Sequence, residues 1–296
     1  MTDATKPKRS NLAVRFMTAG VAAPAIIWML FFAPVWVWPC FVLLLAQPIA
    51  AQELYAMTLR GEKFLIGYGI VSCTAFGLCL FSLLTSPMVP GRFPVLDSTI
   101  APITLVLWAL ITLLVSLSAP TPSKEAGSRM GWLLGGPLYL GSALAVLSAL
   151  HSVDANGGEW VLLSMMLAWF ADTAGYFAGR FGGKKVFGDR QFSPAISPNK
   201  TWEGALGAVG GSVLAIVFAH FTYLPSLPLL GGICVALVAG PVGVCGDLVE
   251  SLIKRSTGAK DSGWIVPGHG GLIDRIDALM YTCTVTFVYA RYILPG

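Results

Sequence analysis

A single stretch decides the fold: LLGGICVALVAGPVGVCGDLVESLIKR, residues 229–255. Its first part is apolar apart from glycines and one proline, which is typical of a helix that crosses hydrocarbon. Acids and bases then enter the same stretch at Asp247, Glu250, Lys254 and Arg255. Charged side chains are costly beside lipid, so a membrane segment that ends in such groups usually marks a functional site.

The composition of the whole chain extends this interpretation. Of 296 residues, 55% are hydrophobic and only 11% are charged, whereas a soluble domain carries about a quarter charged residues. We therefore expect an all-α, polytopic integral membrane protein. The net charge of +4 is mild and the basic residues sit in short loops, so nothing argues for nucleic-acid binding. The six cysteines are scattered and form no zinc-binding or disulfide pattern.

Apolar runs long enough for a bilayer recur along the chain. A spanning helix needs about 20 apolar residues, and this criterion predicts about nine transmembrane helices. They form one continuous membrane domain, with N-terminal helices in 1–150 and C-terminal helices carrying the polar loops in 151–296. Only Ala33-Pro34-Val35 separates the first two, which are either a tight hairpin or one broken element. The predicted spans are 14–33, 36–57, 64–84, 99–118, 131–150, 160–179, 203–223, 229–250 and 275–294.

The distribution of basic residues sets the expected orientation. With the N-terminus in the cytoplasm, the predicted inner segments and their helix entrances hold all 19 Lys and Arg residues except Arg92 and Arg291. Cytoplasmic loops of membrane proteins carry such an excess. The two long polar loops, 180–202 and 251–274, are therefore expected on the cytoplasmic face.

The first polar loop and its flanking helix ends supply five candidate residues. Asp172 lies within a predicted span, where a carboxylate is either a helix-packing group or part of a water-filled site; the basic residues that follow favour the site. Arg180 and Ser197 belong to the loop. Thr201 is suited to cap the next helix. Lys200 has no such structural explanation and could reach a phosphate near the helix N-terminus.

The second polar loop is bounded by acids in pairs. Asp247 and Glu250 are three residues apart, as are Asp274 and Asp277, and this spacing places each pair on one helix face. Acids in a first helical turn can simply complement the helix dipole, which would explain Asp274 or Asp277 but not Asp247. Magnesium takes one or two protein carboxylates and fills its shell with water and substrate phosphates. We predict a Mg²⁺ site with Asp247 and Asp274 as ligands and Asp277 and Glu250 in support.

Basic residues and a glycine-rich turn lie between these acids. Lys254, Arg255 and Lys260 could be ordinary positive-inside residues, but their place between two acidic helix ends favours phosphate binding. The turn PGHGG, residues 267–271, contains His269, Gly270 and Gly271. Its backbone N–H groups could cradle a phosphate, and His269 is a candidate for substrate contact.

The residues from Ser251 to Asp277 resemble the signature of the phosphatidate cytidylyltransferase, or CDP-diacylglycerol synthase, family. The pattern is Ser-x-x-Lys-Arg, then Lys-Asp, a His-Gly-Gly turn and a closing Asp-Arg-x-Asp. The first loop is also similar, through Asp172-Thr173, Gly179-Arg180 and Ser197-Pro198-x-Lys200-Thr201. One small departure is Val266, where the family usually has Leu, Ile or Phe. The matching signature residues are Ser251, Lys254, Arg255, Lys260, Asp261, His269, Gly270, Gly271, Asp274, Arg275 and Asp277.

The resemblance implies transfer of a cytidylyl group from CTP to phosphatidic acid in the bilayer, with Mg²⁺ and a second, monovalent cation such as K⁺. It also implies residence in the bacterial cytoplasmic (inner) membrane, while a homodimer is an open alternative for its assembly. The expected catalytic residues are Asp247, Asp274, Lys254, Arg255, Lys260, Asp261 and Asp172. The expected substrate-binding residues are Lys200, Ser197, Thr201, Arg180, His269, Gly270, Gly271 and Arg275.

Other functions fit some of the same residues. A polyprenol kinase or an ether-lipid cytidylyltransferase would use CTP with similar phosphate chemistry. A transporter of anions or nucleotides would also carry charges and glycine-interrupted helices, but here the charges gather at one face and no repeated half is visible. A purely structural membrane protein would leave the paired acids without a role.

Overall fold

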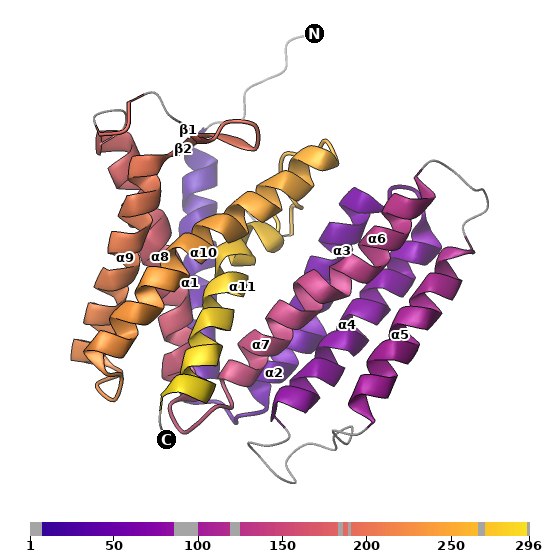
Figure 1. The fold of residues 1–296 in the computed structure, drawn as a ribbon, viewed down its shortest axis with the longest axis horizontal. Coiled ribbons are helices and arrows are strands. Elements are labelled where there is room, and N and C mark those ends of the chain that lie inside the picture. The colour runs from indigo at the N-terminus through magenta and orange to yellow at the C-terminus, as the bar shows by residue number, and fades with distance from the viewer. Residues whose placement is uncertain are drawn as a thin grey trace.

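The computed structural model describes residues 8–85, 100–118, 125–182, 186–188, 191–265 and 270–294, and helices dominate these ranges (Figure 1). In chain order, the helical elements are α1 (Lys8–Phe31), α2 (Val37–Cys40), η1 (Phe41–Ala46), α3 (Gln47–Thr58), α4 (Lys63–Thr85), α5 (Ala101–Ser116), α6 (Ala126–Gly136), η2 (Pro137–Gly141), α7 (Ser142–Leu150), α8 (Gly157–Gly182), α9 (Trp202–Thr222), α10 (Leu229–Ser256), α11 (Ile273–Val288) and η3 (Tyr289–Ile293).

Every predicted span overlaps a helix, but not every helix is long and apolar enough to cross a bilayer by itself. Six helical stretches meet that criterion within the described residues, so the expected count of nine spans is not confirmed. The apolar parts of α1 and α5 are only Phe16–Phe31 and Pro102–Ser116, and α11 has 16 residues. The six stretches are Val37–Thr58, Lys63–Thr85, Ala126–Leu150, Gly157–Gly182, Trp202–Thr222 and Leu229–Ser256.

Two of these stretches contain π-helical segments next to prolines. In the stretch Val37–Thr58, η1 is followed by Pro48, and in Ala126–Leu150, η2 begins at Pro137. Proline has no N–H to donate to the preceding turn, and a π-helical segment absorbs the lost hydrogen bond without ending the helix. Both stretches therefore remain continuous helices of 22 and 25 residues, long enough to cross a bilayer.

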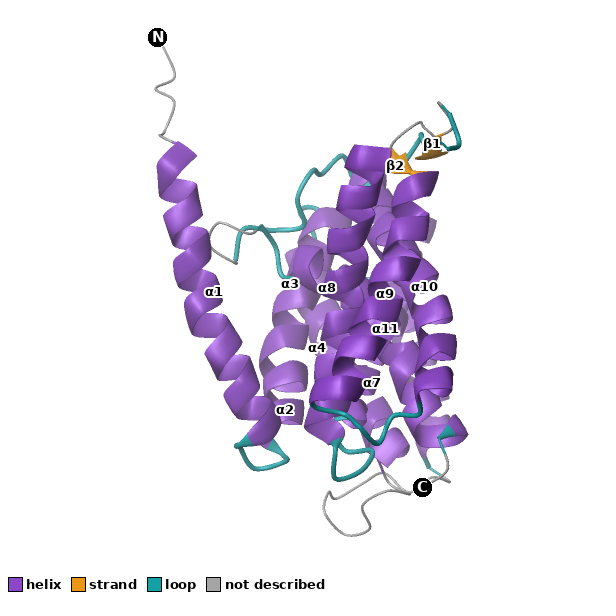
Figure 2. Cartoon of the chain, turned by 90° about the vertical axis from the view of Figure 1, so that its left-hand side faces the viewer, coloured by secondary structure: helices purple, strands orange, loops and turns teal. Residues whose placement is uncertain are grey.

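The chain reverses between α1 and α2, which supports the hairpin alternative for the first two spans. Val37 N donates to Pro34 O over 2.9 Å, and Figure 2 shows α1 descending to the turn from which the next helices rise. Beyond this turn, the helices form two neighbouring groups, with α3–α7 in one and α8–α11 in the other (Figure 1). Buried side chains of α7 and α11 join them, among them Leu144 and Leu279.

One element of the fold was not expected from an all-α interpretation. Strands β1 (Gln191–Ser193) and β2 (Ser197–Thr201) pair antiparallel as a small hairpin in the loop between α8 and α9. The hairpin ends at Thr201, whose Oγ1 accepts a hydrogen bond of 3.1 Å from Gly204 N. The predicted cap of this helix is therefore confirmed, and it fixes the direction in which β2 meets α9.

Small residues bring α8 and α9 close together. A Cβ on Gly207 would lie 2.8 Å from Ala174 O, and one on Gly175 would lie 3.0 Å from Gly204 O. Only glycine permits backbones to approach so closely, as in other membrane helix pairs. This contact keeps the ends of α8 and α9 that the first polar loop connects next to one another.

Candidate functional site

Three carboxylates converge where α10 meets α11. Asp247, Glu250 and Asp277 each offer an oxygen, and these atoms all lie within 4.8 Å of one another. Asp247 and Glu250 share one face of α10 because they are three residues apart. Gly246 permits the approach of α11, since a Cβ there would lie 2.8 Å from Asp277 O. We call these three residues the acidic triad.

The acidic triad has the donor set that a hard divalent cation prefers, because all its ligand atoms are carboxylate oxygens. Glu250 is 2% exposed. Its Oε1 is buried without a hydrogen-bond partner among the described residues, and its Oε2 lies 2.6 Å from Lys254 Nζ. A buried carboxylate oxygen without a partner is costly, and a metal ion bound between the acids would satisfy it. The residues therefore fit Mg²⁺.

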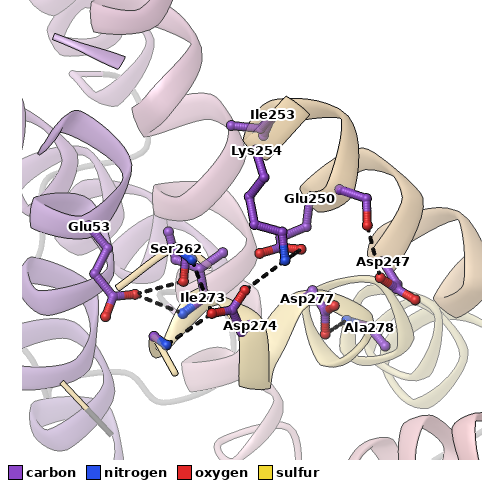
Figure 3. Close-up of polar contacts among 12 residues, drawn as sticks. Glu53, Asp247, Glu250, Ile253, Lys254, Ser262, Ile273, Asp274, Asp277 and Ala278 are labelled. Carbon is purple, nitrogen blue, oxygen red and sulfur yellow. Dashed lines mark hydrogen bonds and ion pairs between the residues drawn. The ribbon is translucent and has the colours of Figure 1, made fainter. Parts of the chain in front are cut away.

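Asp274 lies outside the acidic triad and is held by other groups. Its Oδ1 accepts from Lys254 Nζ over 2.8 Å, and its Oδ2 accepts from Ser262 N over 3.1 Å and Gly271 N over 2.9 Å (Figure 3). The acidic triad thus contains Asp247 but not Asp274, the other predicted ligand, and Lys254 bridges Asp274 and Glu250.

The charge state of Asp274 follows from these contacts. Burial by itself raises the pKa of a carboxyl group. Here the hydrogen bonds from the Lys254 side chain and the backbone N–H of Gly271 outweigh burial, and they hold the pKa of Asp274 below its ordinary value. Asp274 is therefore ionised at neutral pH, and it keeps Lys254 charged beside the acidic triad.

Lys200 connects the first polar loop to the acidic triad. Its Nζ lies 2.6 Å from Asp247 Oδ2 and donates to Val244 O over 3.2 Å. Ser251 Oγ donates to the other oxygen of Asp247 over 3.4 Å. The two loops are far apart in sequence, and this contact brings them into one site.

A cavity of about 570 Å³ lies between α8, α9 and α10 beside this contact. Five of the predicted residues line it, and they combine two acids, two bases and a hydroxyl. Such a cavity is large enough for a nucleotide or a lipid headgroup. The five residues are Asp172, Arg180, Lys200, Thr201 and Asp247.

The remaining predicted residues lie around the site in different ways. Gly270 adopts a φ of +87°, which favours glycine, but the N–H of Gly271 is already bonded to Asp274 and is not free to bind phosphate. Ser197 is half-buried at the start of β2. His269 lies outside the described residues. Four other predicted site residues are exposed to solvent: Arg255, Lys260, Asp261 and Arg275.

Glu53 on α3 is a further buried acid beside the site that the sequence patterns do not indicate. Its carboxylate is 4% exposed and accepts hydrogen bonds from Leu272 N and Ile273 N at 3.0 and 3.1 Å. The available signal was an acid inside an apolar span, which in a membrane protein usually faces a partner or a functional site. The backbone groups that Glu53 binds lie 219 and 220 residues further along the chain, so no local sequence pattern indicates this contact.

Comparison with known proteins gives the family of this chain. The model of the cytidylyltransferase family matches residues 13–293. Phosphatidate cytidylyltransferase of Haemophilus influenzae is 41% identical over 142 residues, which cover 46% of this chain and 47% of that protein. The protein of the same name from Brucella suis is 36% identical over 167 residues, which cover 55% of this chain and 58% of that protein.

The chain thus spans about half the length of those two curated relatives. A longer match joins it to phosphatidate cytidylyltransferase of Bacillus subtilis, which is 31% identical over 215 residues, covering 72% of this chain and 77% of that protein. The family model extends over most of the chain and includes the acidic triad. This chain belongs to the cytidylyltransferase family.

Proposed function

We propose that this chain transfers a cytidylyl group from CTP to phosphatidic acid, giving CDP-diacylglycerol and pyrophosphate, with Mg²⁺ at the cytoplasmic membrane face. The observation that carries the proposal is the acidic triad with a lysine on either side: Lys200 on Asp247 and Lys254 on Glu250. Carboxylates gathered for a cation beside lysines suit the transfer of a charged phosphoryl group. The names of the relatives support the same reaction.

The substrates supply the reacting atoms in this reaction. A phosphate oxygen of phosphatidic acid forms a bond to the α-phosphorus of CTP, and the bond from that phosphorus to the β-phosphate oxygen breaks. The electron pair leaves with pyrophosphate. The protein need not provide a nucleophile, so its work is to position two anionic substrates and to neutralise their charge.

The side chains divide this work by position. Asp247, Glu250 and Asp277 would hold Mg²⁺, which when bound stabilises negative charge on phosphate oxygens. Arg180 and Lys200 face the cavity and would bind the phosphates of CTP. When a substrate phosphate arrives, Lys200 can turn from Asp247 toward it, because both partners of this ion pair are partly exposed.

The position of the site at helix ends suits substrates of opposite solubility. CTP enters from water, while acyl chains keep phosphatidic acid in the bilayer, so the reaction must occur at headgroup depth. Positive-inside placement of the loops favours the cytoplasmic face, where CTP is found. Asp172 would contribute to the wall of the cavity that separates the triphosphate from the hydrocarbon.

The test uses the full chain, purified in detergent, with CTP, phosphatidic acid and Mg²⁺. Release of pyrophosphate should require both substrates, and label at the α-phosphorus of CTP should enter the lipid. Transfer of label from the γ-phosphorus instead would identify a kinase and overturn the proposal. Uptake of CTP into liposomes without turnover would favour a transporter.

A further inference from the structure

Glu53 on α3 binds two parts of the loop that precedes α11: Ser262 within the loop, and Leu272 and Ile273 where α11 begins. Its Oε1 accepts from Leu272 N over 3.0 Å, and its Oε2 accepts from Ile273 N over 3.1 Å and from Ser262 Oγ over 3.3 Å. Figure 3 shows Glu53 pointing from its helix toward Ser262 and Ile273. One carboxylate from the N-terminal half of the chain thus holds two segments of the C-terminal half.

This contact replaces a cap that the local sequence lacks. Leu272 occupies the N-cap position of α11, and its side chain makes no capping hydrogen bond. The first N–H groups of a helix have no partner within the helix, and the helix dipole makes this end positive. Glu53 supplies an acceptor and a negative charge there from another helix. In return, the N–H groups stabilise a carboxylate within an apolar span, where an isolated charge would be costly.

The loop packs closely around this carboxylate. A Cβ on Gly271 would lie 2.7 Å from Glu53 Oε2, and one on Gly263 would clash with Oε1. Two glycines therefore flank Glu53, one on each side of the loop. Because no side chain separates backbone from carboxylate, a small change at Glu53 must move the loop backbone itself.

Asp274 binds the same two parts of the loop, at Ser262 and Gly271, and links Glu53 to the acidic triad. Ser262 donates its hydroxyl to Glu53 and its N–H to Asp274. The other oxygen of Asp274 accepts from Lys254, and Lys254 pairs with Glu250. A continuous set of hydrogen bonds and ion pairs therefore runs from Glu53 through Ser262, Asp274 and Lys254 to Glu250.

We propose that Glu53 is a positioning residue that sets the placement of Asp274 and Lys254 by fixing the start of α11 and Ser262. Its role rests on the proposed cytidylyl transfer, but the contact itself does not. Glu53 does not touch the acidic triad. It acts through the loop, so its loss should change turnover more than substrate affinity.

The decisive variant is Glu53→Gln, which keeps the size of the side chain. An amide offers one oxygen acceptor, and its NH₂ group would face an N–H or hydroxyl donor. We expect kcat to fall by about 10- to 100-fold, in the range seen when groups that orient metal ligands are replaced, while KM for CTP changes little. The matched control is Glu62→Gln, because Glu62 pairs with Arg129 over 3.2 Å outside this loop, and kcat should stay at the wild-type level.

Hydrogen exchange of the backbone separates positioning from general destabilisation. In Glu53→Gln, the amides of residues 271–273 should exchange faster, while peptides from α8 and α9 keep wild-type rates. If Glu53→Gln does not fold, Glu53→Asp is used, because it keeps the charge with a shorter reach. Unchanged exchange at 271–273 in the folded variant would overturn the proposal, and so would faster exchange with wild-type kcat.

The two proposals fail in different ways. If the wild-type chain releases no pyrophosphate with CTP and phosphatidic acid, the proposed function is wrong, yet the exchange of residues 271–273 still tests whether Glu53 holds the loop. If the wild type is active and Glu53→Gln raises KM for CTP without lowering kcat, Glu53 belongs to binding and the positioning role is wrong.

Discussion

Lys200 Nζ lies 2.6 Å from Asp247 Oδ2, so the hairpin β1–β2 is tied to the acidic end of α10. The side chains of these residues are 21% and 35% exposed, and ion pairs at such exposure add little to stability. The role of this pair is placement, because it brings a partly exposed positive charge to the edge of both the cavity and the acidic triad.

Replacing Lys200 should therefore affect activity more than stability. We expect Lys200→Met to raise KM for CTP by at least about 10-fold, since a charge-assisted hydrogen bond to phosphate is worth about 1.5–3 kcal/mol. The thermal midpoint in detergent should stay near that of the wild type. Lys63→Met, at the exposed start of α4, serves as the control. A large fall in the midpoint of Lys200→Met with unchanged KM would show that the pair is structural.

Removal of one triad carboxylate should abolish most of the activity. We expect Asp247→Asn to lower kcat by at least about 10²-fold, as for other single electrostatic groups in active sites, and to raise the Mg²⁺ concentration needed for half-maximal rate. Chelation with EDTA should stop the wild-type reaction, and added Mg²⁺ should restore it. These rates are measured by pyrophosphate release.

The control for this variant is Asp154→Asn. Asp154 accepts from Trp160 Nε1 over 3.1 Å outside the site, and its replacement should leave the Mg²⁺ dependence unchanged. Full turnover of Asp247→Asn, or activity of the wild type in EDTA, would show that the acidic triad does not serve as the metal site.

Much of the fold was predictable because it depends on local composition. Each predicted span overlaps a helix, since an apolar run in lipid must satisfy its own backbone hydrogen bonds. The spacing of Asp247 and Glu250 also correctly predicted a shared face. The N-cap of α9 at Thr201 followed from capping chemistry, and Thr201 Oγ1 accepts the hydrogen bond from Gly204 N.

The rest depends on contacts between distant segments. Asp274 and Asp277 have the same spacing as the pair on α10, and the sequence does not reveal which of them meets Glu250 and which meets Lys254. That choice depends on how α11 crosses α10, which Gly246 permits. Likewise, the partner of Glu53 lies in a loop more than 200 residues away, and nothing near Glu53 indicates it.

The charge of Asp274 should make stability depend on pH. Its pKa is lower in the folded protein than the ordinary 3.8, so its ionised form stabilises the fold above that value, and this contribution is lost as pH falls through the folded pKa. The thermal midpoint of the wild type should exceed that of Asp274→Asn at neutral pH. The difference should shrink between about pH 5 and pH 3. A difference that stays constant over this range would contradict the assignment.

The approach of α11 to α10 can be tested with a pair of glycine variants. A Cβ on Gly246 would lie 2.5 Å from Tyr281 Cδ2 and 2.8 Å from Asp277 O, so Gly246→Ala should push α11 away and cost about 1–3 kcal/mol. Because Asp277 moves with α11, Mg²⁺ affinity should also fall.

Gly210 on α9 provides the matched comparison, because a Cβ there meets nothing within 4 Å. Gly210→Ala should be neutral or stabilising by up to about 1 kcal/mol, from helix propensity alone. The measurements are thermal unfolding and Mg²⁺ titration of activity. Equal effects of the two variants would show that the contact at Gly246 does not set the site.

Thr201 combines a cap with a place on the cavity wall, and two substitutions separate these roles. Thr201→Ala removes the acceptor for Gly204 N and should cost about 1 kcal/mol of stability. It also removes a hydroxyl that can donate to a substrate phosphate, so KM for CTP should rise. Thr201→Ser keeps the hydroxyl and should restore both properties. If Thr201→Ala lowers the thermal midpoint but leaves KM unchanged, the hydroxyl acts only as a cap, and Lys200 alone carries the phosphate contact from this end of β2.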